Sequence, residues 1–161
     1  MEATLTLYIK KISDQHHEFR YVRSDGSGET LTLDSKTFLL HDLIHFAVES
    51  RAGLADSFYG LLVSGETYDS LNEKHSIKDG FGGELGMTER IVGGLTPVMK
   101  GNATPEQFLA AARNLIEAYN RKLPMWLDQG FIADVQEHIR RIVGEWNSIA
   151  YGDTLILHFY I

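Results

Sequence analysis

The sequence predicts an α+β fold, in which a small, mainly antiparallel sheet from both ends of the chain packs against a layer of four or more helices. Two observations lead to this prediction. Apolar and polar residues alternate with a period of two over the N-terminal residues, and a short apolar run typical of a strand ends the chain, whereas apolar residues in the middle recur with the helical period. Strands and helices therefore form separate blocks, and the βαβ units of a parallel sheet are not expected.

The N-terminal residues are expected to form a three-stranded antiparallel meander. Residues 3–9 alternate between apolar and polar side chains, which is typical of a half-buried strand. Residues 17–23 and 29–33 alternate in the same way. The Asp-Gly-Ser-Gly segment at residues 25–28 lies between them and favours a tight hairpin turn.

The C-terminal residues 153–161 are expected to form the last strand. Their sequence, DTLILHFYI, is apolar on both faces, which predicts an interior position in the sheet with the first strand as a neighbour. No repeat, linker or low-complexity segment divides the chain, so residues 1–161 are expected to form a single domain.

The middle of the chain carries clear signals for helix starts and ends. Asp34 or Ser35 is a suitable N-cap for the first helix, and Gly53 is a suitable residue to end it. Thr104 followed by Pro105 opens another helix with the pattern of a capping box. The expected helices span residues 35–51, 56–64, 84–96, 128–147 and a segment from Thr104 towards Pro124.

Glycine and proline residues mark the region between these helices. Residues 72–83 are expected to be a loop, and Pro97 is expected to end or kink the helix that precedes it. The stretch GFGGELG resembles a phosphate-binding loop, but it lacks the lysine of a P-loop and no expected strand precedes it. The nearby helical glycines, Gly93 and Gly94 among them, are best explained by close approach of another helix.

Composition excludes several classes of function. The chain has no cysteine, which excludes thiol catalysis, cysteine-ligated zinc and iron–sulfur clusters. The net charge is −7 and the basic residues are scattered, so neither nucleic acid nor an anionic membrane is an expected partner. The N-terminal residues lack the pattern of a signal peptide and no segment has the apolar length of a membrane span, so we expect a cytoplasmic protein.

The segments LLHDLIHFAVESRAGL and DSFYGLLVSGETY resemble an uncharacterised family of bacterial proteins. The similarity extends along most of the chain and includes TERIVGGLTPVMKG and GDTLILHF. The resemblance implies a bacterial source and a single domain. It implies no activity and assigns no functional residue.

One polar constellation can carry chemistry. On the helix over residues 35–51, apolar side chains cover an arc of roughly 200°, and the remaining arc holds His41, His45 and Glu49 at successive i+4 steps with Asp42 beside them. Side chains four residues apart lie on the same helix face, so the two imidazoles can bind zinc, iron or manganese together.

The string HDLIH is similar to the HExxH zinc motif, with Asp42 in place of the glutamate. A third ligand would come from Glu66 or from Glu49, although Glu49 lies two turns from His41. Asp42 and Glu49 are the candidate catalytic carboxylates. The alternative is that the histidines and these carboxylates simply form the solvated face of an otherwise apolar helix, and their position on the helical wheel favours this alternative.

The remaining histidines are weaker candidates. His138 borders the apolar face of the last helix and His158 lies in the last strand, so either can complete a metal site. A hydrogen-bonded structural role is more common for such residues. His16 and His17 lie near the first hairpin and are expected to be solvated.

Two functions remain open from the sequence. The first is a binding or assembly module with an apolar or glycine-lined groove between helices, for a partner or a small-molecule ligand. The second is a metal-dependent or acid–base enzyme that uses the face of the first helix carrying His41 and His45. Because the last strand and the first helix are largely apolar on several sides, a homodimer through a helical face is also expected.

Overall fold

The computed structural model describes residues 4–75 and 83–161 and shows an α+β fold. Its sheet is antiparallel throughout and has the strand order β3-β2-β1-β4. The first strand pairs with both the second and the last, as expected, so the two ends of the chain meet in one sheet. The strands are β1 (Leu5–Lys11), β2 (His16–Arg23), β3 (Gly28–Asp34) and β4 (Thr154–Phe159).

The predicted interior position of the last strand is wrong, because β4 forms an edge of the sheet. Its burial alternates: Leu155 and Leu157 face the core, whereas Ile156 on the opposite face is 48% exposed. Strand β2 already occupies one side of β1, so β4 takes the other side and no described strand follows it.

Six helices are described: α1 (Ser35–Ala52), α2 (Phe58–Val63), α3 (Tyr68–His75), α4 (Gly83–Met99), α5 (Pro105–Ala118) and α6 (Gln129–Ser148). The predicted caps are confirmed. The side chain of Asp34 accepts a hydrogen bond from the backbone of Thr37, and Gly53 adopts a left-handed φ of 67° at the C-cap of α1. Thr104 and Gln107 form a complete capping box at the start of α5.

Two segments differ from the expectation. The loop expected over 72–83 is wrong for residues 72–75, which belong to α3, and for Gly83, which begins α4; residues 76–82 lie outside the described residues. Helix α4 continues past Pro97 to Met99. Because Pro97 lies in the last turn, its missing N–H removes a single hydrogen bond and the helix ends shortly afterwards.

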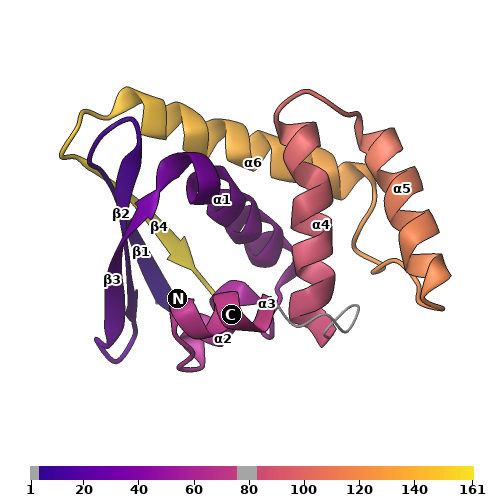
Figure 1. Ribbon diagram of the computed structural model, residues 1–161, viewed down its shortest axis with the longest axis horizontal. Helices are drawn as coiled ribbons and strands as arrows, with labels where there is room; N and C mark the ends of the chain where they lie inside the picture. Colours follow the sequence, from indigo (N-terminus) through magenta and orange to yellow (C-terminus); the bar gives the residue numbers. More distant parts are fainter. Residues whose placement is uncertain (1–3, 76–82) are drawn as a thin grey trace.

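Helix α1 is the centre of the fold. It lies against one face of the sheet, between α6 and α4, and α5 packs on the outer side of α4 (Figure 1). Every residue from 42 to 49 is buried, polar ones included. The interpretation of His45, Glu49 and Asp42 as a solvated stripe is therefore wrong, because neighbouring elements cover the helix on all sides over residues 42–49.

The prediction that His17 is solvated is also wrong. Its side chain is fully buried, its Nδ1 lies 2.9 Å from the hydroxyl of Ser35, and its ring lies edge-on to Trp146. The neighbouring His16 is exposed, as expected. Among the described residues, no helix is both long enough and apolar enough to cross a membrane.

Candidate metal centre

Helices α1 and α4 bring two imidazoles and one carboxylate together. His41 and His45 are one turn apart on α1, and their ring centroids are separated by 4.7 Å. Glu89 on α4 faces both rings: its Oε1 lies 2.5 Å from Nε2 of His45 and its Oε2 lies 3.4 Å from Nε2 of His41. One nitrogen from each ring and one oxygen of Glu89 all lie within 4.8 Å of one another, as the ligands of a single metal ion do.

The imidazole nitrogen that faces away from Glu89, which is Nδ1 in both histidines, contacts a carboxylate of α1. Nδ1 of His45 lies 2.8 Å from Oε2 of Glu49, and Nδ1 of His41 lies 3.3 Å from Oδ1 of Asp42. A carboxylate that contacts the far nitrogen fixes the tautomer and orientation of a metal-binding histidine. Both rings are therefore arranged with Nε2 directed towards Glu89.

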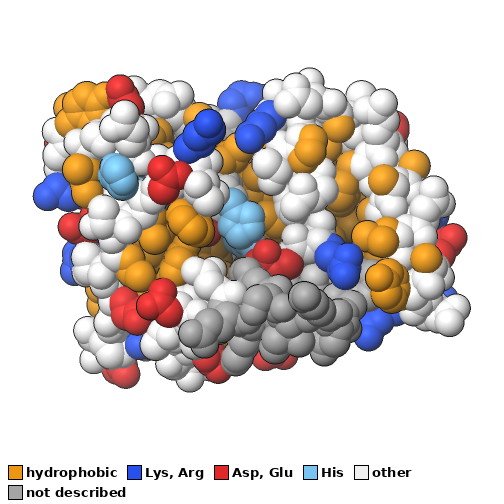
Figure 2. Space-filling model, viewed as in Figure 1, with side chains coloured by type: hydrophobic (Ala, Val, Ile, Leu, Met, Phe, Trp, Pro, Cys, Tyr) orange, Lys and Arg blue, Asp and Glu red, His pale blue; other side chains and the backbone are white. Residues whose placement is uncertain are grey.

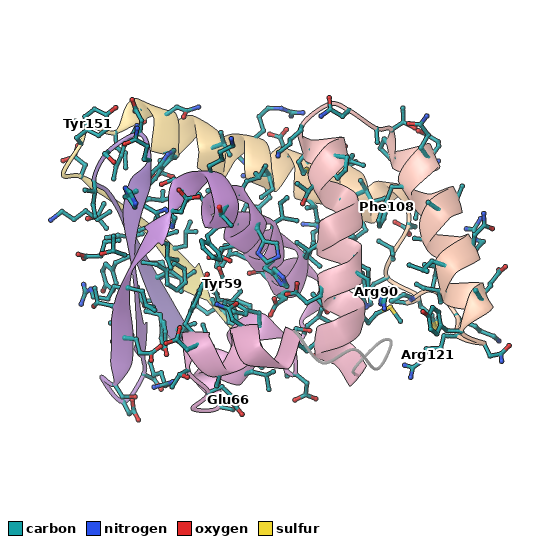
Figure 3. All side chains as sticks on the ribbon, in the orientation of Figure 1. Tyr59, Glu66, Arg90, Phe108, Arg121 and Tyr151 are labelled. Atoms are coloured by element: carbon teal, nitrogen blue, oxygen red, sulfur yellow. The ribbon has the colours of Figure 1, made fainter. Side chains whose placement is uncertain are left out.

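These two carboxylates are fixed in turn by tyrosines. The other oxygen of Glu49 accepts the backbone N–H of Tyr59 at 2.8 Å, and the other oxygen of Asp42 accepts the hydroxyl of Tyr68 at 2.9 Å. The hydroxyl of Tyr59 also donates to the backbone carbonyl of Asp42 at 2.8 Å. The cluster is therefore supported by a connected network, with Tyr59 lying beneath α1 (Figure 3).

The contact between His45 and Glu89 is close but poorly aligned. Although 2.5 Å separates the two atoms, Nε2 of His45 makes no hydrogen bond of normal geometry within residues 4–75 and 83–161. The N–H direction of the ring thus misses the oxygen.

The cluster is closed on one side and open on the other. The side chains of His45 and Glu49 have no exposed surface, whereas those of His41 and Glu89 are 34% and 21% exposed. Figure 2 shows histidine and acidic side chains at the surface near the middle of this face. A bound ion would therefore be reachable from solvent past His41 and Glu89.

The electrostatics favour positive charge in the cluster. Burial alone would lower the pKa of His45, but the contacts with Glu49 and Glu89 raise it to about 10. Burial likewise opposes the charge on His41, whereas Asp42 and Glu89 raise its pKa to about 9. Burial raises the pKa of Glu49.

The carboxylates of Asp42, Glu49 and Glu89, together with the imidazolium ions of His41 and His45, carry a net charge of −1. The same three carboxylates with two neutral imidazoles and one divalent cation also carry −1. A divalent metal ion can therefore replace two protons without changing the charge of the cluster.

The structure brings His41 and His45 together as the sequence predicted, but the third member of the cluster is Glu89. Glu49 lies behind His45, against the nitrogen that faces away from Glu89. Glu66 lies beside α2 and α3 at the periphery, where Ser70 donates to its carboxylate (Figure 3). The only sequence signal for Glu89 was weak: an acidic residue at the border of the apolar face of its helix.

The two carboxylates proposed as catalytic residues lie on the protein side of the imidazoles. Asp42 is 3% exposed and Glu49 is fully buried, so this position fits orientation of the rings rather than contact with a substrate. His138 packs against Phe46, and His158 lies across from Thr6 on the open face of the sheet. Neither belongs to the cluster of His41, His45 and Glu89.

Comparison with known protein families, with curated proteins and with solved structures finds no match to this chain. The resemblance to a bacterial family therefore stays a prediction.

Proposed function

We propose that this protein is a metal-dependent enzyme that holds one divalent transition-metal ion on His41, His45 and Glu89. The observation that carries the proposal is the orientation of the two imidazoles. Both Nε2 atoms approach one carboxylate of α4, while both Nδ1 atoms contact carboxylates of α1. This pattern of ligands and supporting carboxylates is typical of histidine-rich metal sites.

The open side supports a catalytic rather than a structural role. Catalytic zinc sites have three protein ligands and leave a position for water or substrate, whereas structural sites use four protein ligands. Two histidines and one glutamate are a known zinc set, and two histidines with one carboxylate also bind iron(II) in non-haem sites. A divalent ion held by His41, His45 and Glu89 would supply Lewis-acid activation of water, and the reaction class we propose is hydrolysis.

A specific observation supports a second candidate. The ring of His45 lies 2.8 Å from Glu49 and 2.5 Å from Glu89, so its imidazolium can serve as a structural bridge between the two carboxylates, and the protein then acts as a binding module in which a metal ion plays no part. The expected homodimer belongs with this second candidate and stays a prediction. A measurement of metal binding distinguishes the two functions, because only the enzyme requires a bound ion.

The experiment uses full-length protein without a histidine tag. Metal content is measured after purification, and the metal-free protein is titrated with zinc, manganese and, without oxygen, iron(II). We expect one ion per chain. His41→Ala and Glu89→Gln should each weaken binding by at least about tenfold, since the first removes a ligand nitrogen and the second replaces a charged carboxylate by a neutral amide, both at partly exposed positions.

Two matched variants control for nonspecific effects. His138→Ala removes a histidine outside the cluster, and Glu145→Gln removes an exposed carboxylate of α6. Both should bind metal like the unmodified protein. Hydrolysis of model esters, amides and phosphoesters is then compared with and without metal. Failure of all three metals to bind in a one-to-one ratio would refute the metal centre, and binding without hydrolysis would refute the proposed reaction.

A further inference from the structure

The outer edge of β4 carries backbone hydrogen-bonding groups that no described strand satisfies. Lys11 donates its backbone N–H to the carbonyl of Asp153, which continues the register between β1 and β4. In an antiparallel ladder, alternate residues of a strand bond to a given neighbour. The odd-numbered residues of β4 therefore bond to β1, and the backbone N–H and C=O groups of Thr154, Ile156 and His158 point away from it.

The described part of the chain gives this edge none of the usual protection against pairing with another strand. Natural edge strands are protected by charged residues, by proline, by β-bulges or by a covering helix. Strand β4 contains no aspartate, glutamate, lysine, arginine or proline, and its register with β1 is unbroken. Of the described helices and strands, only β1 makes extensive backbone contact with it. The opposite edge of the sheet differs, because β3 has an acidic residue near each end, Glu29 and Asp34.

The exposed side chains along this edge are largely apolar. Ile156 is 48% exposed, and Tyr160, which follows the strand on the same face, is 45% exposed. An exposed apolar edge strand is a template for a strand of another chain, because only a strand matches its alternating donors and acceptors. The partner that fits this edge is therefore a β-strand and not a helix or a small molecule.

A second copy of this chain supplies a matching strand. Under a two-fold axis, two identical antiparallel strands present the same donors and acceptors to each other, so the edge is complementary to itself. The net charge of −7 opposes the association of two copies, but the uncharged sequence of β4 adds no repulsion at the contact itself. Ile156 is the middle one of the three outward-facing residues, so an axis at Ile156 pairs all three: Ile156 faces Ile156 of the partner subunit, and Thr154 faces His158 of the partner subunit.

We infer that this protein forms a two-fold homodimer in which the β4 strands of two copies pair antiparallel at Ile156 and join the two sheets into one. Each outward-facing residue donates one backbone hydrogen bond and accepts another. The contact is short, and small interfaces are typical of weak complexes, so we expect a dissociation constant of about 100 μM. This edge is a different surface from the helical face through which the sequence predicts a homodimer, and the pairing requires no metal ion.

Sedimentation equilibrium of the full-length protein, from about 10 μM to about 1 mM, should show a shift from monomer to dimer mass. Ile156→Lys places two like charges opposite each other at the axis and removes an apolar contact, so it should weaken dimerisation by at least about tenfold. The matched control is Thr32→Lys, at an exposed position on the same face of β3 at the other edge. It should change the dissociation constant by less than about twofold, since it lies outside the contact.

Amide hydrogen exchange of the unmodified protein tests the strand pairing directly, even if Ile156→Lys fails to fold. The amides of Thr154, Ile156 and His158 should exchange at least about threefold more slowly at 1 mM than at about 10 μM, because most chains are then paired. The amides of Leu155 and Leu157 should be protected at both concentrations, since they bond to β1. Glu89→Gln should dimerise like the unmodified protein, because the edge contains no residue of the proposed metal centre.

Three results would overturn the inference. The first is a monomer mass at every concentration up to about 1 mM. The second is a dimer that folded Ile156→Lys and Thr32→Lys weaken equally or leave unchanged, since the two copies would then meet elsewhere. The third is a dimer whose formation leaves the exchange of the Thr154, Ile156 and His158 amides unaltered, because pairing through β4 has to protect them.

Discussion

Glu49 gives a sharp test of the cluster, because the change from glutamate to glutamine preserves size and alters only charge and hydrogen bonding. One carboxylate oxygen accepts the backbone N–H of Tyr59 and the other contacts Nδ1 of His45, both at 2.8 Å. Both neighbours can donate a hydrogen bond, and a carboxylate accepts both. A glutamine amide has one acceptor and one donor end, so it can satisfy only one of them.

Either orientation of the amide that Glu49→Gln introduces has a cost. If its oxygen faces Tyr59, its NH₂ group faces the imidazole of His45, which must then accept at Nδ1 and carry its proton on Nε2. A protonated Nε2 cannot bind a metal ion. If the amide is reversed, its NH₂ group meets the backbone N–H of Tyr59, and a buried donor is left unsatisfied.

The magnitude follows from these contacts. The first orientation replaces the charged contact between Glu49 and His45 by a neutral hydrogen bond, and the second leaves a buried donor unsatisfied. Each costs about 1–3 kcal/mol, so the free energy of unfolding of Glu49→Gln should fall by that amount in the presence of a chelator. Loss of a carboxylate that supports a metal-binding histidine weakens metal affinity by about 10–100-fold. Urea unfolding measures the first effect, and zinc titration measures the second. Glu145→Gln, at an exposed position, serves as the control and should change the free energy of unfolding by less than about 0.5 kcal/mol.

The two measurements separate the proposed functions. A structural ion network predicts the loss of stability and no zinc binding in any variant. A metal centre predicts both the loss of stability and the loss of affinity. A Glu49→Gln protein with unchanged stability and unchanged zinc affinity would refute this reasoning, because the buried contacts of Glu49 would then have no energetic effect.

Three further predictions use other parts of the molecule. If zinc is present at about 100 times its Kd, a chelator should lower the free energy of unfolding by about 2.7 kcal/mol. This decrease should be absent from Glu89→Gln, and an equal decrease in the unmodified protein and in Glu89→Gln would contradict the proposed ligands. Gly94→Ala should destabilise by about 1–3 kcal/mol, because its Cβ would lie 2.6 Å from an aromatic carbon. Gly93→Ala, with nothing within 4 Å of its Cβ, should instead stabilise by about 0.5–1 kcal/mol, and the same sign for both in urea unfolding would contradict the packing argument. Burial lowers the pKa of His17 in the folded protein against the opposing charges of nearby carboxylates, so stability should be fully present above the unfolded pKa of about 6.5 and fall as the pH drops below it. Unfolding curves from pH 8 to 5 should show this loss in the unmodified protein and in His16→Gln but less of it in His17→Gln, and parallel curves for all three proteins would count against it.

Local signals in the sequence were sufficient for most of the fold. The caps at Asp34 and Thr104 depend on residues within three positions of each other, so the chain determines them without tertiary contacts. The placement of β4 at an edge depends on the whole sheet. Its apolar residues on both faces suggested an interior strand, although Ile156 is exposed on the face of the sheet that none of the described helices covers.

The cluster was predictable only in part, because one of its members is placed by tertiary packing and not by local sequence. The pairing of His41 with His45 follows from the geometry of a single helix. Glu89 lies far along the chain and reaches the histidines only because α4 packs on α1. The burial of His45 was missed because a narrow polar arc was interpreted as solvent-facing, whereas a helix apolar over most of its circumference is more typical of a buried one.

Stability alone does not explain why charged groups lie at the centre of this fold. Replacing a buried ionic cluster by well-packed apolar residues is often neutral or stabilising by about 1–4 kcal/mol. The surroundings of His45 suit such a replacement, because its side chain is fully buried and Phe58 packs against its ring. The chain instead keeps two imidazoles and supports each with a carboxylate that is itself hydrogen-bonded. An arrangement that orients lone pairs towards one partly exposed point is better explained by a cation that binds there than by the packing of the core.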